Sequence, residues 1–448
     1  MKYLTCILLL LMLPACSLTI PGVASAPTPT PSVTLPASLP RPPRPPTPIP
    51  PQPTLAPTPT LAPLTLSERR RIFVQVWETV RDHYLYADYN GVDWQAVYDE
   101  VSAQVDASTD AEAFYRLMER MIERLDDDHS RYESPQEVAA QQAEFSGTLR
   151  YGGIGAEIRD VDEGGLISSV VPGGPADRAG IMPRDVIISV DGVDYEDSDA
   201  FGPGGPISQV RGEPGTPVRL GIRSPNQPPR EVVVIREVID LDAFNRVHAR
   251  RLANSSLGLL SIPSFYVEGV DRQVRQAVED LLQDGPLTGL IIDVRANGGG
   301  YVHLMRNTIA LFHDGGIIGS TSGRSSSEEQ RIPTGKQIPD LREVPIVVLV
   351  SEETISAAEM FAAGMQVLGR ARIVGTPSAG NTENLYSYDF ADGSRLLLAE
   401  VAFYLPDGTP VEGRGVQPDR RVDAEWWRYQ PEDDPQIQAA IEELQRAE

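Results

Sequence analysis

The sequence predicts an α+β chain of several domains, because the hydrophobic pattern changes twice along its 448 residues. Apolar residues recur at helical spacing from Ser67, short β-rich segments between glycine turns begin near Gly147, and strands alternate with helices from about Asp240. This length suits two to three domains at about 100–200 residues each. The expected divisions are a helical subdomain at 67–145, a β-rich domain at 146–238, an α/β core at 239–424 and a polar tail with a peripheral helix at 425–448.

The N-terminus has the pattern of an export signal. Lys2 precedes the apolar run Ile7–Leu13, which is too short to span a bilayer and has the size of a signal-peptide core. The run ends in Leu-Pro-Ala-Cys, which resembles a bacterial lipobox. We therefore expect a lipoprotein signal peptide over 1–16, lipidation of Cys16, and a membrane-anchored protein outside the cytoplasmic membrane or in the cell envelope. Cleavage near Val23–Ala26 is the alternative and would give a secreted protein.

Residues 17–66 are rich in proline and threonine and lack apolar periodicity, which predicts a disordered, polyproline-II-like spacer. The formal charge of the chain is −24, and this sign argues against binding to nucleic acid or to anionic lipid. Both cysteines, Cys6 and Cys16, precede the globular part, which therefore has no cysteine nucleophile and no cysteine zinc site. The lysines are Lys2 and Lys336, so lysine chemistry has a single candidate after the signal peptide.

The helical subdomain is predicted from three amphipathic patterns. One begins at Ser67, a second covers Trp94–Val105, and a third follows the capping residue Asp110. Their apolar faces carry Ile72, Val76, Val80 and Tyr84 in the first, and Phe114, Leu117, Met118, Met121 and Leu125 in the third. An acidic segment that contains His129 follows.

The β-rich segment resembles a PDZ domain over 146–238. A glycine-rich loop, a Pro-Ala-x-x-Ala-Gly helix start and an Asp-x-Ile-x-x-Val-Asp-Gly strand and turn occur in that order. In such a domain an extended peptide adds to a sheet edge while loop N–H groups capture its C-terminal carboxylate. The loop candidates are Gly153, Ile154, Gly155 and Ala156; the structural alternative is that the glycines only permit a bulged strand.

The α/β core is predicted from alternating strands and helices, with the sheet covered on at least one face. The expected strands are Leu257–Ile262, Gly289–Arg295, Pro345–Val350 and Arg372–Val374, and the expected helices are Val270–Leu282, Val302–Phe312 and Ser356–Leu368.

Two loops in the core could support chemistry. Ser356 opens a helix, where free N–H groups and the helix dipole can stabilise an oxyanion. The same Ser-Ala-Ala-Glu motif is also a capping box, so local sequence alone favours a structural role. The second loop, Asn297–Gly300, follows a buried strand and lets backbone N–H groups approach a substrate, or forms a tight turn only.

Histidine is the usual general base for a serine. Of the five histidines, His129 has the most suitable environment, since the neighbouring carboxylates Asp126, Asp127 and Asp128 can orient its ring. A solvated acidic loop is the alternative for this segment. Metal-ligand spacing does not accompany His129, and no metal or organic cofactor is expected.

The combination of these motifs resembles the carboxy-terminal processing peptidases, the tail-specific proteases of family S41, over about residues 68–422. The resemblance implies a protease core of the ClpP/crotonase-like type with an inserted PDZ domain. It implies that Ser356 is the nucleophile and that the oxyanion hole is formed by Ala357 together with Gly299 or Gly300. The processing peptidases use a lysine as the base, and at that position this chain has Asn381. A Ser–Lys pair would have to use Lys336.

A tricorn-like branch of the family uses histidine and glutamate with the serine. His129 occupies the position of that histidine, and Glu412, in the Glu-Gly-x-Gly-Val-x-Pro-Asp-like stretch, occupies that of the glutamate. Asp128 is a second candidate to orient the ring. The expected protein is a cell-envelope serine endopeptidase that acts on polypeptides captured by their free C-termini, as a possible homo-oligomer. A non-catalytic PDZ-type binding protein is the rival, because the lysine is absent.

Overall fold

The computed structural model describes residues 63–108, 110–127, 129–145, 152–201, 205–239, 244–253 and 255–446. Cys16, residues 17–62 of the predicted spacer and Asp128 lie outside the described residues, and so do the predicted lipidation and the predicted role of Asp128. The last residue of the predicted spacer, Leu66, is described and already belongs to a helix. Among the described residues, no helix combines the length and the apolar character needed to cross a bilayer.

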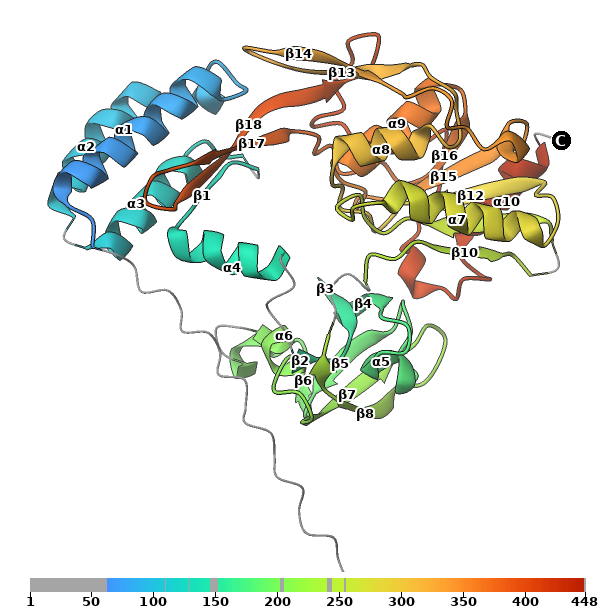
Figure 1. Ribbon diagram of the computed structural model, residues 1–448. Coiled ribbons are helices and arrows are strands. Elements are labelled where there is room, and N and C mark those ends of the chain that lie inside the picture. Colours follow the sequence, from blue (N-terminus) through green and yellow to red (C-terminus); the bar gives the residue numbers. More distant parts are fainter. Residues whose placement is uncertain are drawn as a thin grey trace, which may run out of the picture. The chain divides into compact units, whose positions relative to one another are not determined.

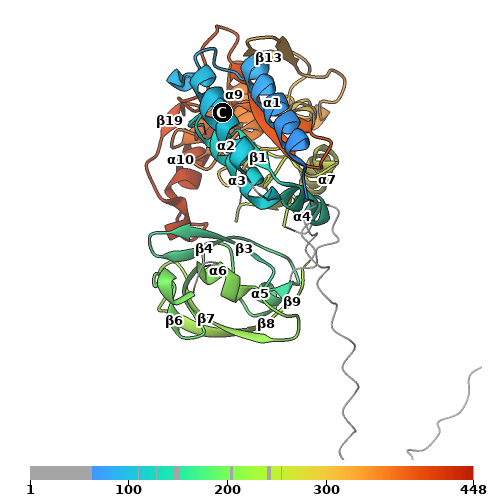
Figure 2. The same cartoon turned by 90° about the vertical axis from the view of Figure 1, so that its left-hand side faces the viewer.

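The helical subdomain has three predicted helices and a fourth that was not predicted. They are α1 (Leu66–His83), α2 (Trp94–Ala107), α3 (Ala111–Glu123) and α4 (Pro135–Phe145). The predicted apolar faces of α1 and α3 are buried, and Asp110 caps α3 by accepting a hydrogen bond from Ala113 N at 2.8 Å. Figure 2 shows α1, α2 and α3 beside strand β1 (Arg131–Glu133).

Strand β1 connects the helical subdomain to the C-terminal half of the chain. It pairs antiparallel with β18 (Arg395–Tyr404), and Leu396 and Leu398 of β18 complete the core beneath the helices. On its other pairings β18 meets β17 (Asn384–Asp389) and β13 (Ile317–Gly323), and β13 pairs with β14 (Ser327–Arg331). Figure 1 shows this sheet reaching from the helices to the core. The sequence did not predict it.

Residues 152–239, called the β domain below, form a six-stranded antiparallel sheet with β3 at one edge. Its strands are β2 (Gly152–Gly153), β3 (Ala156–Val161), β4 (Gly164–Val170), β5 (Val186–Val190), β6 (Val193–Asp194), β7 (Pro217–Arg223), β8 (Arg230–Ile235) and β9 (Glu237–Val238). Two short helices, α5 (Pro175–Arg178) and α6 (Gly205–Val210), complete the domain. The short strand β2 pairs with β9 outside the main sheet.

The core contains a second six-stranded sheet, in the order β10-β11-β12-β15-β16-β19, in which neighbours from β11 to β19 run parallel. The strands are β10 (His248–Arg251), β11 (Leu257–Ser261), β12 (Gly289–Asp293), β15 (Ile346–Val350), β16 (Ala371–Gly375) and β19 (Arg420–Arg421). The helices are α7 (Val270–Gln283), α8 (Val302–Ile309), α9 (Ala357–Val367) and α10 (Pro435–Arg446).

Alternate strand residues of this sheet pack against different helices. Ile292 and Val348 face the cluster that contains α7, α8 and α9, whereas Ile291 and Val347 face α10. The sheet is therefore covered on both faces, as expected for parallel strands. The helix predicted in the tail is present as α10, but it is not peripheral, because its Ile437 and Leu444 are buried against the sheet.

Candidate active site

Ser356 lies between β15 and α9 in an unusual backbone conformation. Its φ of 58° and ψ of −122° are rare for a residue with a side chain and cost about 1–3 kcal/mol. Its N–H donates to Asn381 O at 2.8 Å and to Glu359 Oε2 at 3.0 Å, which holds the strained residue in place. The residue therefore sits on a sharp turn at the positive end of a helix.

The glycine run lies directly against this turn. A Cβ on Gly299 would come within 2.8 Å of the Ser356 Cβ, and a Cβ on Gly300 would come within 2.2 Å of the Phe265 backbone, so both positions require glycine. Asn297 fixes the loop, since its carbonyl accepts from Ile355 N at 3.0 Å and its Oδ1 accepts from Gly299 N at 2.8 Å.

Two of the three predicted oxyanion donors remain available for a substrate. The hydrogen bonds described for residues 255–446 give no acceptor to the N–H of Gly300 or of Ala357. The N–H of Gly299 differs from the expectation, because it is already donated to Asn297. Its contribution is close packing against Ser356.

His129 reaches the core through the pairing of β1 with β18. The next residue, Ser130, accepts a hydrogen bond from Ala399 N of β18 at 3.0 Å, and Glu383 immediately precedes β17, which also pairs with β18. This arrangement places His129 Nδ1 at 3.2 Å from Glu383 Oε2. The other oxygen of Glu383 accepts from Tyr86 Oη at 2.6 Å. Burial raises the pKa of the Glu383 carboxyl above its ordinary value, with Tyr86 and His129 opposing that shift.

Asn381 connects the predicted base to the predicted nucleophile. Its side-chain amide contacts His129 Nε2, while its backbone carbonyl accepts the Ser356 N–H. If Nδ1–H of a neutral imidazole faces Glu383, Nε2 carries a lone pair toward the amide NH₂. If the ring is an imidazolium, Nε2–H faces the amide oxygen instead. In either form Nε2 points toward Asn381, whose backbone carbonyl accepts a hydrogen bond from the Ser356 N–H.

Glu412 does not occupy the expected place. Its Oε2 accepts from Thr382 N at 2.6 Å and from Thr382 Oγ1 at 3.1 Å, so it holds the chain between Asn381 and Glu383. The carboxylate on His129 is Glu383, to which sequence reasoning gave no role. The predicted contact between Glu412 and His129 is therefore corrected: Glu412 binds Thr382, and the next residue, Glu383, contacts the imidazole. No sequence pattern marks Glu383, which stands in a loop without periodicity.

Asp127 completes the surroundings of His129. Its Oδ1 accepts from His129 N at 2.9 Å. One ligand atom each from Asp127, His129 and Glu383 lies within 4.8 Å of the others, so a cation could be held here among the described residues. His129 and Glu383 are already paired with each other in this arrangement.

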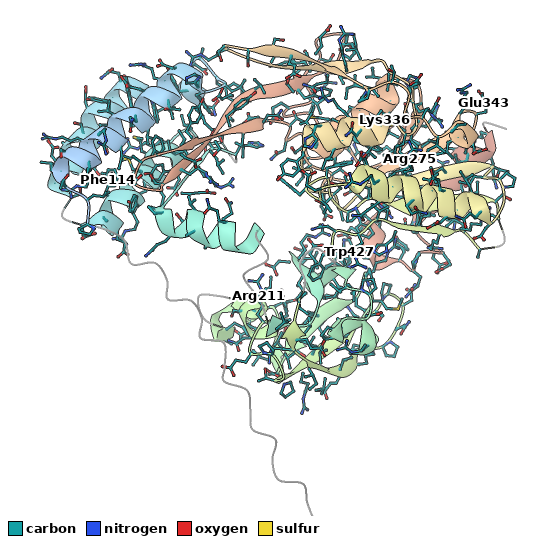
Figure 3. The ribbon with its side chains drawn as sticks, viewed as in Figure 1. Phe114, Arg211, Arg275, Lys336, Glu343 and Trp427 are labelled. Carbon is teal, nitrogen blue, oxygen red and sulfur yellow. The ribbon has the colours of Figure 1, made fainter. Side chains whose placement is uncertain are left out.

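Lys336 is engaged elsewhere. Its Nζ donates to Asn307 Oδ1 of α8 at 2.9 Å, and its carbonyl accepts from Arg275 of α7. Figure 3 labels Lys336 and Arg275 on the α7–α8 side of the core. The contacts described for Lys336 include none to Ser356. This geometry gives no support to a Ser–Lys pair.

Glu359 is the buried support of the whole turn. Its carboxylate accepts four hydrogen bonds, from Ser356 N at 3.0 Å, Ser378 Oγ at 2.6 Å, Gly380 N at 2.6 Å and Asn381 N at 2.8 Å. Burial raises its pKa, against the opposing effect of these donors. The capping-box interpretation was thus correct for Glu359 but incomplete, because the carboxylate also organises residues 378–381.

We expect Glu359→Gln to disorder this turn. An amide NH₂ in place of one oxygen would face two donors, and each unsatisfied buried group costs about 1–3 kcal/mol. The expected result is a fall in the free energy of unfolding of at least about 2 kcal/mol, measured by denaturant titration. Glu112→Gln, on the exposed side of α3, is the control and should change stability little. Equal stability of Glu359→Gln and the parent protein would contradict the assigned support.

In the β domain the predicted peptide loop precedes an open edge. Ile154 is buried and its carbonyl accepts from Ala176 N at 2.7 Å, so its side chain belongs to the domain core. Gly155 has a φ of 71°, and Ala156 begins β3, the edge strand of the sheet. Gly153 pairs with Glu237. A loop followed by an edge strand is the geometry that β-strand addition needs.

Comparison with known proteins identifies three matching family models. Residues 256–422 match peptidase family S41, residues 66–123 match the tricorn protease C1 domain, and residues 166–199 match the PDZ domain. The β domain therefore contains the predicted PDZ segment.

Individual relatives agree with these models. A carboxyl-terminal-processing protease of Synechocystis is 26% identical over 80% of this chain and 82% of its own length. The chloroplastic carboxyl-terminal-processing peptidase 2 of Arabidopsis thaliana is 26% identical over 79% of this chain and 69% of its own. Among solved structures, the photosystem II D1 C-terminal processing protease has a TM-score of 0.58 at 24% identity, covering 81% of this chain and 95% of that one. This structural likeness concerns the fold.

Proposed function

We propose that the chain is a serine endopeptidase with Ser356 as nucleophile and His129 as general base, because residues 256–422 match peptidase family S41 and the similar curated proteins are carboxyl-terminal-processing proteases. The observation that carries this proposal is the continuous contact chain from Glu383 through His129 and Asn381 to Ser356. Glu383, rather than Glu412, is the carboxylate that orients the imidazole.

In the proposed reaction these groups act in turn. Ser356 Oγ attacks the scissile carbonyl carbon while His129 Nε2 takes its proton, and the carbonyl oxygen becomes an oxyanion. The N–H groups of Gly300 and Ala357 stabilise that oxyanion. His129 then protonates the leaving amine, which departs and leaves an acyl-enzyme. A water molecule, deprotonated by His129, hydrolyses the ester and restores Ser356.

His129 must exchange one partner to act in this way. Nε2 contacts the Asn381 amide in the described state and must turn to Ser356 Oγ for proton transfer. This change of partner from Asn381 to Ser356 is local, because the backbone carbonyl of Asn381 accepts a hydrogen bond from the Ser356 N–H. An asparagine amide cannot itself take the proton at neutral pH.

We expect Glu383→Gln to lower kcat/KM by about 10²-fold, because the amide no longer stabilises the imidazolium. In the parent protein, protonation of Glu383 on acidification should lower activity. Because the pKa of this carboxyl is raised, that contribution to the loss should begin at a higher pH than for an ordinary glutamate, whose pKa is about 4.3. Glu412→Gln is the matched control and should change the rate less than Glu383→Gln. The reverse order of the two variants in a pH-rate measurement would restore Glu412 as the orienting carboxylate.

We further propose that the β domain captures substrates by their C-terminal carboxylate, at the loop containing Gly153, Ile154, Gly155 and Ala156. The edge position of β3 directly after this loop supports it. A charge-assisted hydrogen bond contributes about 1.5–3 kcal/mol, so a peptide with a free C-terminus should be cleaved with a kcat/KM about 10- to 100-fold above its amidated form. Mass spectrometry of matched peptide pairs measures this. Equal rates for the two forms would refute carboxylate capture and leave the endopeptidase proposal standing.

A further inference from the structure

A buried cluster of charges joins the β domain to the core through the C-terminal segment. Asp434, which precedes α10, accepts from Arg184 Nη2 of the β domain at 3.0 Å and from Arg295 Nη1 of the core at 2.8 Å, both on Oδ2. The side chains of Asp434 and Arg295 are 0% and 1% exposed, and that of Arg184 is 10% exposed. A single carboxylate oxygen thus bridges two guanidinium groups from different parts of the fold.

The remaining contacts make the cluster rigid. Arg295 also forms a bidentate pair with Asp293, with Nη2–Oδ2 at 2.7 Å and Nε–Oδ1 at 3.0 Å. The Trp426 ring lies 4.5 Å from the Arg295 guanidinium carbon and 5.1 Å from that of Arg184. Arg184 adopts a φ of 79°, a left-handed conformation that persists only where surroundings enforce it.

Arg295 is also part of the frame beneath the active site. Its carbonyl accepts from Ser351 Oγ at 2.8 Å, in the loop that leads to Ser356. Asn297, which holds the Gly299 N–H, follows two residues later in the glycine loop. A shift of Arg295 would therefore displace both loops of the proposed oxyanion hole, the loop before Ser356 and the glycine loop at 297–300.

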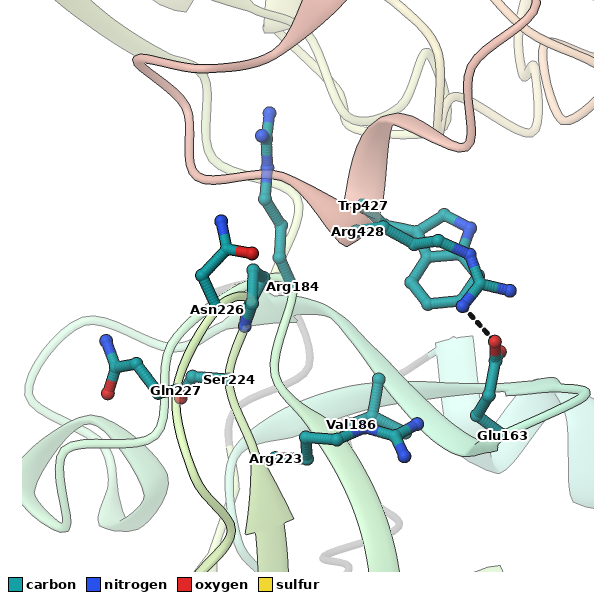
Figure 4. Close-up of a pocket in the computed structure, with 10 residues that line it drawn as sticks. Glu163, Arg184, Val186, Arg223, Ser224, Asn226, Gln227, Trp427 and Arg428 are labelled. Atoms are coloured by element: carbon teal, nitrogen blue, oxygen red, sulfur yellow. Dashed lines mark ion pairs between the residues drawn. The ribbon is translucent and has the colours of Figure 1, made fainter.

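Other ion pairs cross the same boundary without reaching Arg295. Arg428 pairs with Glu163 beside a crevice of about 290 Å³, and Figure 4 shows this pair together with Arg184 rising to the C-terminal segment. Arg159 of β3 pairs with Glu353. Only the Arg184 contact, among these three, shares an acceptor with Arg295.

We propose that Asp434 and Arg184 are positioning residues that couple the docking of the β domain to the geometry of the oxyanion loop. When the β domain is docked, Arg184 and Trp426 hold Asp434 against Arg295, and Arg295 holds the loop at 297–300. This inference rests on the proposed function, because the loop matters only if it stabilises an oxyanion.

The connection can be cut without leaving a buried charge unpaired. In Arg184→Met, Asp434 keeps Arg295 and the N–H of Gln436, which donates to its Oδ1 at 2.9 Å. Arg428→Met is the matched control, since it removes a guanidinium from the same boundary but not from the cluster.

The experiment uses the full chain and a small fluorophosphonate probe, which has no C-terminus for the β domain to capture. We expect Arg184→Met to lower the maximal labelling rate of Ser356 by about tenfold with little change in the half-saturating probe concentration. Arg428→Met should match the parent protein, and Arg184→Lys, which keeps the charge, should lie between. Circular dichroism checks that each variant is folded.

Two results would overturn the inference. One is an unchanged labelling rate in folded Arg184→Met; the other is an equal loss in Arg428→Met, which would indicate general loosening of the boundary. Failure of the proposed function is a separate outcome, in which the parent protein itself is not labelled. If Arg184→Met does not fold, the Arg184→Lys rate decides, and equality with the parent protein contradicts the coupling.

Discussion

Replacing Ser356 with alanine is expected to abolish peptide hydrolysis, with a loss of the order of 10⁶-fold that places the variant below detection. In the proposed mechanism the Ser356 hydroxyl forms the acyl-enzyme, and the alanine side chain has no group that could take its place. Product formation from an unmodified polypeptide, followed by mass spectrometry, measures the effect.

The Ser356→Ala variant should remain folded. The position keeps a Cβ, and the backbone hydrogen bonds from Ser356 N to Asn381 and Glu359 are unaffected. Ser387→Ala, on the exposed face of β17, is the control and should retain full activity. Residual hydrolysis by Ser356→Ala above the background of a boiled sample would show that another residue is the nucleophile.

His129→Ala is the second large effect. General acid–base catalysis contributes up to about 10⁴-fold, and in this mechanism His129 handles the proton in every step, so we expect kcat to fall by about 10³- to 10⁴-fold. KM should change little, because the imidazole acts on the serine proton rather than on substrate binding.

The controls for His129 separate the two rival bases. His313→Ala removes an imidazole that contacts Gly315 O at 3.0 Å in the core and should leave kcat unchanged. Lys336→Ala should also leave it unchanged, since Lys336 is bonded to Asn307. Loss of activity in Lys336→Ala together with an unaffected His129→Ala would favour the Ser–Lys alternative.

Much of the fold could be predicted because its elements carry their own signals. The helices α1 and α3 have clear apolar faces, Asp110 is a recognisable cap, and the buried strands β12 and β15 are continuous apolar runs. The expected helix at Val302–Phe312 ends earlier, at Ile309. Ser356 and the glycine run could be found because a helix start and consecutive glycines are visible in one short window of sequence.

The surroundings of His129 could not be predicted in the same way. Strand β1 has only three residues, Arg131–Glu133, too few for a period-two pattern, and its partner β18 lies far along the chain. The contact between His129 and Glu383 depends on β1 and β17 both pairing with β18. Local sequence indicates which helix or strand a segment forms, whereas the contact of Glu383 with His129 results from pairing between strands that lie far apart in the chain.

The C-terminal tail is a second case in which local sequence did not reveal long-range contacts, here contacts between charged and polar groups. Its composition is polar, and this suggested a peripheral helix, yet Asp434 and Gln436 are fully buried beside Arg295. Buried polar groups of this kind are tolerated because each finds a partner. The partners come from the loop after β12 and from the β domain, and no pattern within the tail reveals them.

The most direct test is to map the fluorophosphonate adduct by peptide mass spectrometry and to compare its rate of formation among variants. The account predicts one adduct, on Ser356, that is absent from Ser356→Ala and forms at least about 10²-fold more slowly in His129→Ala. An adduct on a different residue, an unchanged rate without the imidazole, or no adduct on the intact full-length chain would contradict it; the last result would instead favour a binding protein without catalytic activity.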